Sequence, residues 1–569
     1  MKMKQVLIAL AAMVVFVAAN LNAQTPQVIG IGSSAMWLEL GQASASVQGC
    51  SWTVAKGTVV ASDSRVSGTA SDGGTAENGA TWITWTPGTG TCASPTGTFF
   101  INAQMNTDSV VGNRCYFANP RCKILVPSGQ VGLSGAGLLT GFTDTALPSN
   151  VQSALNGQYF NAAMSDIRPE DAKFASLRMF TACGTAVSTG SQYYGLGYQT
   201  ATPGVGNAVK ESSLAGSGSF HVFDFNLAGT DPINGNALPG TYTVTPIGAV
   251  PVVVFVNPSN ESGFGSLQVS NVNRATLAGY LDGTYGRTAD LVPQTGAGGT
   301  VGSIVFVREP LSGTYNTMEY AIPNSIELQT SQDLGVAAVN AKSGSGIPMD
   351  YCNGSNWNTN QNPLAETATG LGRNATNSNG AGRYRAIGTG DEVAAVLKYG
   401  DSLGYSFWSA ANFANATATG GKYLTVDGVD PLQEVWQDGL IPTSGNGQLG
   451  NVTLAHVKDG TYPIWSILRI ISDNSLSSTV STLVGEVANF LSPTQPDFVH
   501  ASTLQIVRSH FAPPGIGAFP CSGTASTPSN GTSSGECGGD VGGLVYTIGS
   551  DKDFNTDTGS TLGNTGRRQ

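Results

Sequence analysis

Two apolar segments constrain the fold of this chain most. Residues 250–256 form a continuous apolar run that suits a strand buried on both faces of a sheet, and residues 301–307 form an apolar, strand-like run. Residues 271–280, between them, carry a helical pattern. The succession of strand, helix and strand predicts an α/β fold, with a mostly parallel sheet covered by helices on both faces. Further strands are predicted at 27–30, 123–126, 403–408 and 462–471, and further helices at 34–40, 391–399 and 483–491.

The N-terminus has the pattern of an export signal. Lys2 and Lys4 precede an apolar run at 6–19, and small residues at 21–23 offer a cleavage site. This run is too short for a membrane span, and no second run of spanning length follows. We therefore expect a signal peptide at 1–23 and a periplasmic or secreted mature chain.

The cysteine content fits an oxidising compartment. Eight cysteines are present, and their even number favours disulfides over free buried thiols. The short spacings predict the pairs Cys115–Cys122 and Cys521–Cys537. No CxxC motif occurs and the four histidines are scattered, so we expect no metal site, and nothing points to a cofactor.

Composition excludes some functions and divides the chain. Charged residues make up 11%, the net charge is −11 and no basic stripe occurs, which argues against nucleic-acid binding. The 75 glycines indicate a loop-rich secreted protein. Residues 49–127 are rich in Gly, Thr and Ser and hold four of the eight cysteines, so they predict a β-rich, disulfide-tied insertion. Residues 516–569 form a low-complexity tail.

The segment that follows the strand at 301–307 has the groups of an oxyanion site. Arg308 offers a planar fork of N–H donors. Ser312 and Thr314 offer hydroxyls, while Gly313 allows the backbone to approach a ligand closely. A helix that starts here would also direct its free N–H groups at an anion. The simpler alternative is a helix cap after an exposed arginine.

Three other segments, each just after a predicted strand, offer groups suited to the same ligand. They are the glycine turn at 30–34, the turn at 132–135, and residues 160–166, which end in Ser165 and Asp166. Together with the 308–314 segment, they make the chain resemble the periplasmic phosphate-binding proteins of phosphate ABC transporters. The positions that match the phosphate-binding residues of that family are Ser34, Ala35, Ser134, Asp166, Arg308, Ser312, Gly313 and Thr314.

The resemblance implies a type II periplasmic binding protein with two lobes. Lobe one would comprise 24–185, with the insertion at about 49–127, and the return segment 455–515; lobe two would comprise 186–454. Two crossover strands would form the hinge. The implied function is capture of inorganic phosphate for an ABC-transporter permease by a monomer that is not an enzyme. Asp166 would accept the proton of phosphate and so reject sulfate.

The chain departs from the family at three places. Residues 283–290 match the family's Trp-Asn-Asp segment only weakly. About 100 residues separate Ser34 from Ser134. Pro310 stands where the family has an aspartate that orients the arginine. The alternatives are therefore the same fold with another oxyanion ligand, or a secreted structural protein that has lost phosphate binding.

Two enzymatic motifs are rejected. The Gly30-x-Gly32-x-x-Ala35 pattern lacks the acidic residue of a nucleotide site some 20 positions on. The GxSxG match at 531–535 lies in the tail, with no buried strand before it and no histidine after it.

Overall fold

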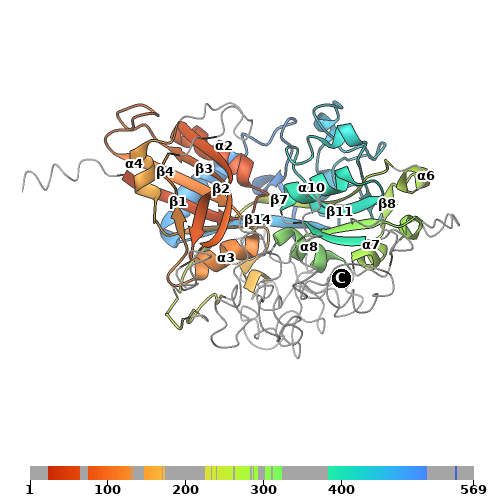
Figure 1. Cartoon of the computed structure of the whole chain (residues 1–569), viewed down its shortest axis with the longest axis horizontal. Helices are drawn as coiled ribbons and strands as arrows, with labels where there is room; N and C mark the ends of the chain where they lie inside the picture. Colours follow the sequence, from red (N-terminus) through yellow and green to blue (C-terminus); the bar gives the residue numbers. More distant parts are fainter. Residues whose placement is uncertain are drawn as a thin grey trace, which may run out of the picture.

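The computed structural model describes residues 24–63, 75–129, 132, 146–169, 171–173, 225–231, 234–238, 240–259, 263–281, 285, 287–291, 301–308, 312–322, 382–386, 388–508 and 545–547. They form a mixed α/β structure with two lobes, which lie side by side in Figure 1. Lobe one contains the N-terminal strands and lobe two contains the strands around residue 308. Within the described residues, no helix has the length and apolar character needed to cross a membrane.

The strands of lobe one surround β1 (Gln24–Gly32). Its neighbours β4 (Phe99–Asn106) and β6 (Ala162–Ser165) both run parallel to it. Beyond β6 lies β14 (Trp465–Ser472), which is antiparallel. Beyond β4 the sheet continues through three antiparallel pairings, to β3 (Thr75–Trp85), β2 (Cys50–Ser62) and β5 (Lys123–Leu125).

One long strand, β7 (Thr243–Val256), joins the two lobes. Residues 243–251 pair with β14 in lobe one, and residues 252–256 pair with β11 (Ser402–Phe407) in lobe two. The chain returns to lobe one just before β14, where the Val252 N–H donates to the Ile464 carbonyl (2.8 Å). Figure 1 shows β7 and β14 at this junction. Pro251 and Ile464 therefore mark the two crossings between the lobes.

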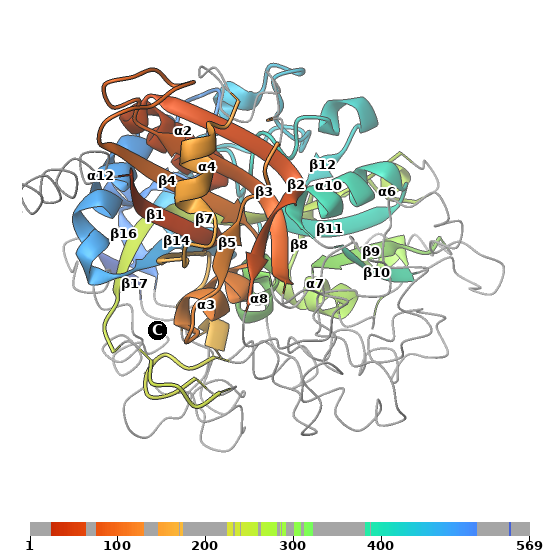
Figure 2. The same cartoon turned by 60° about the vertical axis from the view of Figure 1, so that its left-hand side comes forward.

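Lobe two builds its sheet from β7, β11, β9 (Ile304–Arg308) and β10 (Gly382–Ala386), in that order. Its main helices are α7 (Arg274–Leu281), α8 (Gly313–Ala321) and α10 (Thr389–Lys398). Those of lobe one are α2 (Trp37–Gln48), α3 (Ser109–Phe117), α4 (Ser149–Leu155) and α12 (Ser477–Val487). In Figure 2, α2, α4 and α12 lie on the left and α7 and α10 on the right, while α3 and α8 appear next to each other.

Shorter elements complete the described part of the chain. They are α6 (Phe264–Leu267), β8 (Asn271–Val272), η3 (Thr288–Leu291), η7 (Ala416–Thr419), β12 (Lys422–Tyr423), β13 (Thr425–Val426), η8 (Leu449–Asn451), α11 (Ala455–Lys458), η9 (Asn474–Leu476), β15 (Val499–His500), η10 (Ala501–Thr503), β16 (Ile506–Arg508) and β17 (Val545–Thr547).

The predicted apolar strands are confirmed as β7, β9, β11 and β14, and every residue of β9, β11 and β14 is buried. The predicted helices at 271–280, 391–399 and 483–491 appear, with shifted ends, as α7, α10 and α12. The expectation of a mostly parallel sheet is wrong. The sheet is mixed, because β7 and β14 run antiparallel to each other and to their outer neighbours β11 and β6.

The segment predicted as a disulfide-tied insertion holds β2, β3, β4, α3 and β5. Disulfides join Cys50 to Cys92 and Cys115 to Cys122, so the second of these pairs was predicted correctly; Cys521 and Cys537 lie outside the described residues. Because β4 pairs directly with β1, part of this segment belongs to the central sheet of lobe one. The proposed lobe boundary at residue 185 also lies outside the described residues.

Two buried carboxyl groups meet where the lobes join. Glu39 of α2 is buried beside Asp497, whose carboxylate accepts hydrogen bonds from the Ala410 N–H (2.7 Å) and the Ser409 hydroxyl (3.3 Å). Burial, and then the charge of Asp497, raise the pKa of Glu39 well above its usual value of 4.5. The raised pKa favours the neutral, protonated form of Glu39.

The protonated state of Glu39 predicts a pH-dependent stability. The raised pKa of Glu39 contributes fully to the free energy of unfolding below pH 4.5. This contribution is lost as pH rises from there towards the folded-state pKa. Glu39→Gln removes the titration and keeps a donor for Asp497. We expect this variant to gain roughly 1 kcal/mol in unfolding free energy over the parent for each pH unit of that window. Urea unfolding between pH 4 and 8 measures this, with the surface variant Glu434→Gln as control; parallel curves for Glu39→Gln and parent would contradict it.

Candidate functional site

Asp166 lies at the centre of a buried polar cluster between the lobes. It follows β6 directly and is only 4% exposed. One carboxylate oxygen accepts a hydrogen bond from the Ser33 hydroxyl. The Asp166 N–H donates to Ser109 Oγ (3.1 Å), and its carbonyl accepts from Ser466 Oγ and from Arg469 Nη1 (3.4 Å). Main chain and side chain are thus both fixed within lobe one.

The turn after β1 supplies the first hydroxyl of the cluster. Ser33 accepts the Ala35 N–H at 3.1 Å and donates to Asp166, while its own N–H donates to the Met164 carbonyl of β6 (2.8 Å). The predicted contact residue was Ser34, its neighbour. Ser34 and Ala35 lie in this turn and are half-buried, but the hydroxyl that reaches Asp166 is that of Ser33.

A second turn of the site, between β4 and α3, was not predicted from the sequence. It carries Asp108, the N-cap residue of α3, and Ser109, the first residue of that helix. The Thr107 N–H donates to the Gly32 carbonyl at 2.6 Å, which joins this turn to the turn after β1. The only local signal was Asp-Ser ahead of an apolar stretch, a pattern typical of a helix start.

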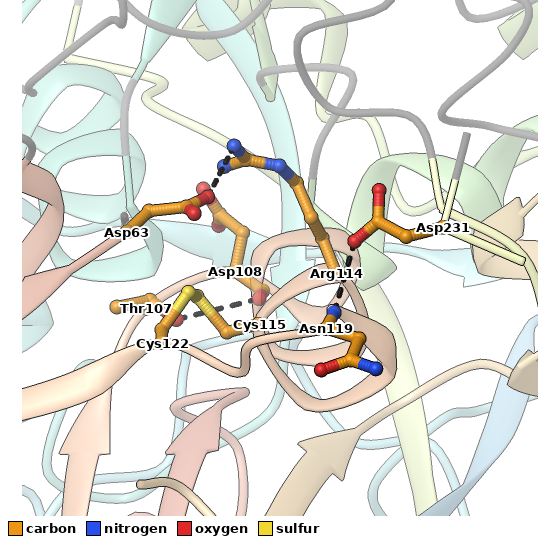
Figure 3. The surroundings of a disulfide bond; sticks show 8 residues. All are labelled: Asp63, Thr107, Asp108, Arg114, Cys115, Asn119, Cys122 and Asp231. Atoms are coloured by element: carbon orange, nitrogen blue, oxygen red, sulfur yellow. Dashed lines mark hydrogen bonds and ion pairs between the residues drawn. A yellow bond between two sulfur atoms is a disulfide. The ribbon is translucent and has the colours of Figure 1, made fainter. Parts of the chain in front are cut away.

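Helix α3 is anchored at its far end, as Figure 3 shows. The disulfide Cys115–Cys122 ties its last turns to the segment before β5. Arg114 forms a fully buried ion pair with Asp63 at 2.5 Å, and the Asn119 N–H donates to Asp231 (2.9 Å). These contacts fix the direction of α3, and thereby the place of the two residues at its N-terminus.

Arg308 brings the positive charge from lobe two. It ends β9, its side chain is 3% exposed, and Nη1 donates to Thr389 Oγ1 (2.8 Å) and to Thr314 Oγ1 (3.3 Å). Nη2 reaches across to Asp108 Oδ1 of lobe one at 3.5 Å. On the other side, Nε lies 3.9 Å from Glu392 Oε2 of α10.

Glu392 was not singled out in the sequence. Its other oxygen accepts the Tyr405 N–H at 3.1 Å, which holds the carboxylate in place beside the arginine. Pro310 and Glu309 lie outside the described residues. Among the described residues, α10 thus supplies a carboxylate beside the arginine.

Helix α8 begins at the lobe contact. Ser312 is its N-cap, and its hydroxyl accepts the Thr314 N–H at 3.1 Å. Gly313 faces lobe one so closely that a Cβ there would lie 2.5 Å from Ser109 Oγ and against the Asp166 carboxylate. The start of α8, with the positive end of its helix dipole, thus faces Asp166.

This close approach makes Gly313 a sensitive position. Gly313→Ala is expected to weaken binding of an anion between the lobes by tenfold or more (~1.4 kcal/mol), because its methyl group would hold the lobes apart. Gly485→Ala in α12 is the matched control, since a Cβ there meets nothing within 4 Å. Isothermal titration calorimetry of both variants measures the effect, and equal affinities would show that the lobes do not close at Gly313.

The environment of Asp166 sets its charge. Burial raises the pKa of its carboxyl to about 6, against the lowering effect of hydrogen bonds from Ser33 and Ser109 and of the charges of Arg308 and Arg469. Above pH 6 Asp166 is therefore an ionised acceptor, and below pH 6 a neutral donor.

The structure brings together five of the eight predicted residues: Asp166, Arg308, Ser312, Gly313 and Thr314. Ser34 and Ala35 lie in the adjacent turn, and Ser134 lies outside the described residues. The cluster adds Ser33, Asp108, Ser109, Thr389, Glu392 and Arg469. Over the part of the chain that the structure describes, no group of His, Cys, Asp and Glu is arranged to hold a metal ion.

Neither a protein-family model nor a curated protein sequence matches the chain. Its structure is similar to that of solved phosphate-binding proteins at low identity. A phosphate-binding protein from Stenotrophomonas maltophilia is 13% identical, over 82% of this chain and 83% of that chain, with a TM-score of 0.28.

Two transport proteins are similar over shorter stretches. An ABC-type phosphate transport receptor from Vibrio cholerae is 14% identical over 44% of this chain and 70% of that chain (TM-score 0.24). A putative phosphate ABC transporter substrate-binding protein with bound phosphate, from Clostridium perfringens, is 10% identical over 46% and 72% (TM-score 0.23).

Proposed function

We propose that this protein binds inorganic phosphate between its two lobes and delivers it to an ABC-transporter permease. The observation that carries the proposal is the meeting of Asp166 and Arg308 at the start of α8. Asp166 is an acceptor fixed in lobe one, and Arg308 is a charged donor fixed in lobe two. A ligand that bridges them needs both negative oxygens and a proton.

Phosphate meets these two requirements near neutral pH. Its proton is donated to the ionised Asp166 carboxylate, and its oxygens accept from the Arg308 fork, from hydroxyls and from the N–H groups of α8. Sulfate carries no proton at this pH, so its oxygens would face the carboxylate with two acceptors unpaired. The arrangement therefore favours phosphate because it weakens the binding of sulfate.

Binding and release require the lobes to move. Asp166 and Arg308 are both almost fully buried, so an anion enters only when lobe two separates from lobe one. The crossings at Pro251 and Ile464 are where such a hinge motion takes place. A permease that recognises the closed form would receive phosphate from a monomeric, extracytoplasmic carrier that does no chemistry on it.

A thermal-shift series tests the choice of ligand. The chain is dialysed free of anion and then heated with phosphate, arsenate, sulfate or chloride. We expect phosphate at 1,000 times its dissociation constant to stabilise the protein by about 4 kcal/mol, and sulfate to leave it unchanged. Stabilisation by sulfate alone would support another oxyanion ligand, and no stabilisation by any anion would support a structural role.

A further inference from the structure

A short segment of lobe two packs on lobe one beside the crossing at Pro251. Residues 408–410 follow β11 directly. The Trp408 N–H donates to the Pro251 carbonyl (3.0 Å), and its indole Nε1 donates to the Pro496 carbonyl (3.0 Å). Pro496 lies shortly before β15, which pairs with the lobe-one part of β7. The 408–410 segment therefore joins the two lobes next to one of their crossings.

The side chain of Asp497 holds this segment in place. Asp497 is 2% exposed, and its carboxylate accepts the Ala410 N–H at 2.7 Å and the Ser409 hydroxyl at 3.3 Å. The acceptor belongs to the return segment of lobe one, whereas both donors belong to lobe two. We call this set of hydrogen bonds the junction contact.

Glu39 meets Asp497 from within lobe one. It lies on α2, on the other side of the junction from β11 in Figure 1, and is 1% exposed. Among the described residues, neither oxygen of Glu39 has a hydrogen-bond partner. An ionised Glu39 would therefore be a buried charge that lacks a donor and lies beside a second carboxylate, which is a costly arrangement.

Asp497 is the charged residue that acts on Glu39. After burial itself, its charge is the largest cause of the raised pKa of Glu39. The strands and the helix that pack against α2 carry Lys56 of β2, Glu77 of β3 and Glu486 of α12. Of these, Glu486 accepts a hydrogen bond from the exposed Ser46 (2.8 Å), near the C-terminal end of α2.

We propose that the proton of Glu39 controls the junction contact, and with it how firmly the two lobes are joined beside Pro251. While Glu39 is protonated, Asp497 faces a neutral group and keeps its donors in lobe two. When Glu39 loses its proton, two carboxylates repel each other in a contact without water, so the contact opens and water solvates both. A rise in pH thus loosens the junction, whichever anion the lobes bind.

The proposal predicts how fast the Ala410 amide hydrogen exchanges with solvent. Because this amide donates to Asp497, it exchanges only when the junction contact opens. Its protection factor is expected to fall about tenfold per pH unit from pH 4.5 towards the folded-state pKa of Glu39, since each opening releases one proton. In Glu39→Gln no proton is released, so the change should be less than about twofold per unit.

Hydrogen–deuterium exchange of the anion-free full chain at pH 5, 6, 7 and 8, followed by mass spectrometry, tests this. Glu486→Gln removes the other acid near α2 and keeps an acceptor for Ser46, so it should retain the parental dependence. The amides of β14 report global unfolding and should be better protected than Ala410 at every pH. Equal pH dependence in parent and Glu39→Gln would overturn the inference. Equal protection of Ala410 and β14 would also overturn it, because the carboxyl pair would then separate only on global unfolding.

Discussion

Arg308→Ala is expected to abolish phosphate binding. The guanidinium is the positive charge that faces both Asp108 and Glu392, and it also lowers the pKa of Asp166. Truncating one partner of a buried, hydrogen-bonded charge pair in a binding site costs about 2–5 kcal/mol of binding free energy, which corresponds to a loss of affinity of about thirtyfold to several thousandfold. An anion would, in addition, have to bind beside carboxylates with no counter-charge from lobe two.

Two further variants make this result specific. Arg308→Lys keeps the charge without the planar fork, so we expect it to recover only part of the affinity. Arg287→Ala removes a half-exposed arginine of lobe two that pairs with Asp290, and it should bind like the parent. Calorimetry measures all three, with circular dichroism to verify folding. Phosphate binding by Arg308→Ala at parental strength would mean that the site lies elsewhere.

Asp166→Asn is expected to remove the discrimination between phosphate and sulfate. The ionised carboxylate repels an anion without a proton, whereas the asparagine amide can donate to a sulfate oxygen. An unpaired buried acceptor costs about 1–3 kcal/mol, so relieving it should lower the ratio of the phosphate affinity to the sulfate affinity by about five- to 150-fold. An unchanged ratio would remove Asp166 from selectivity.

The same residue predicts a pH effect in the parent protein. Because burial raises the pKa of Asp166 to about 6, its carboxyl becomes a neutral donor as pH falls through that value. Sulfate binding should therefore emerge in the parent below pH 6 and be absent at pH 7.5. In Asp166→Asn, sulfate binding should vary little over the same range. Competition between the two anions at pH 5, 6 and 7.5 measures this dependence.

The parts of the fold that were predicted from the sequence are those with a local signal. The apolar segment at 250–256 is short and rich in valine, which favours a buried strand, and it lies in β7. Arg308 ends β9, and Ser312, Gly313 and Thr314 lie at the start of α8, so all four fall within seven consecutive residues and are close in the chain as well as in the structure. Cys115 and Cys122 are close in the chain, whereas Cys50 and Cys92 are separated by 42 residues and had no such signal.

The parts that were missed depend on contacts between distant segments. Whether Ser33 or Ser34 contacts Asp166 depends on how β1 pairs with β6, which two adjacent serines do not reveal. Asp108 and Ser109 reach the site because β4 runs beside β1, although composition placed β4 in an insertion. In the sequence, Glu392 is one acidic residue of an amphipathic helix. Its contact with Arg308 arises only from the packing of α10 against β9.

Calorimetric titration of the anion-free chain at pH 7.5, first with phosphate and then with sulfate, tests the central claim most directly. A buried acceptor and a buried fork of donors predict micromolar or tighter binding of phosphate and no heat of binding with sulfate. No heat of binding with either anion, or equal affinity for both, would contradict the assignment of Asp166 and Arg308 as a phosphate site.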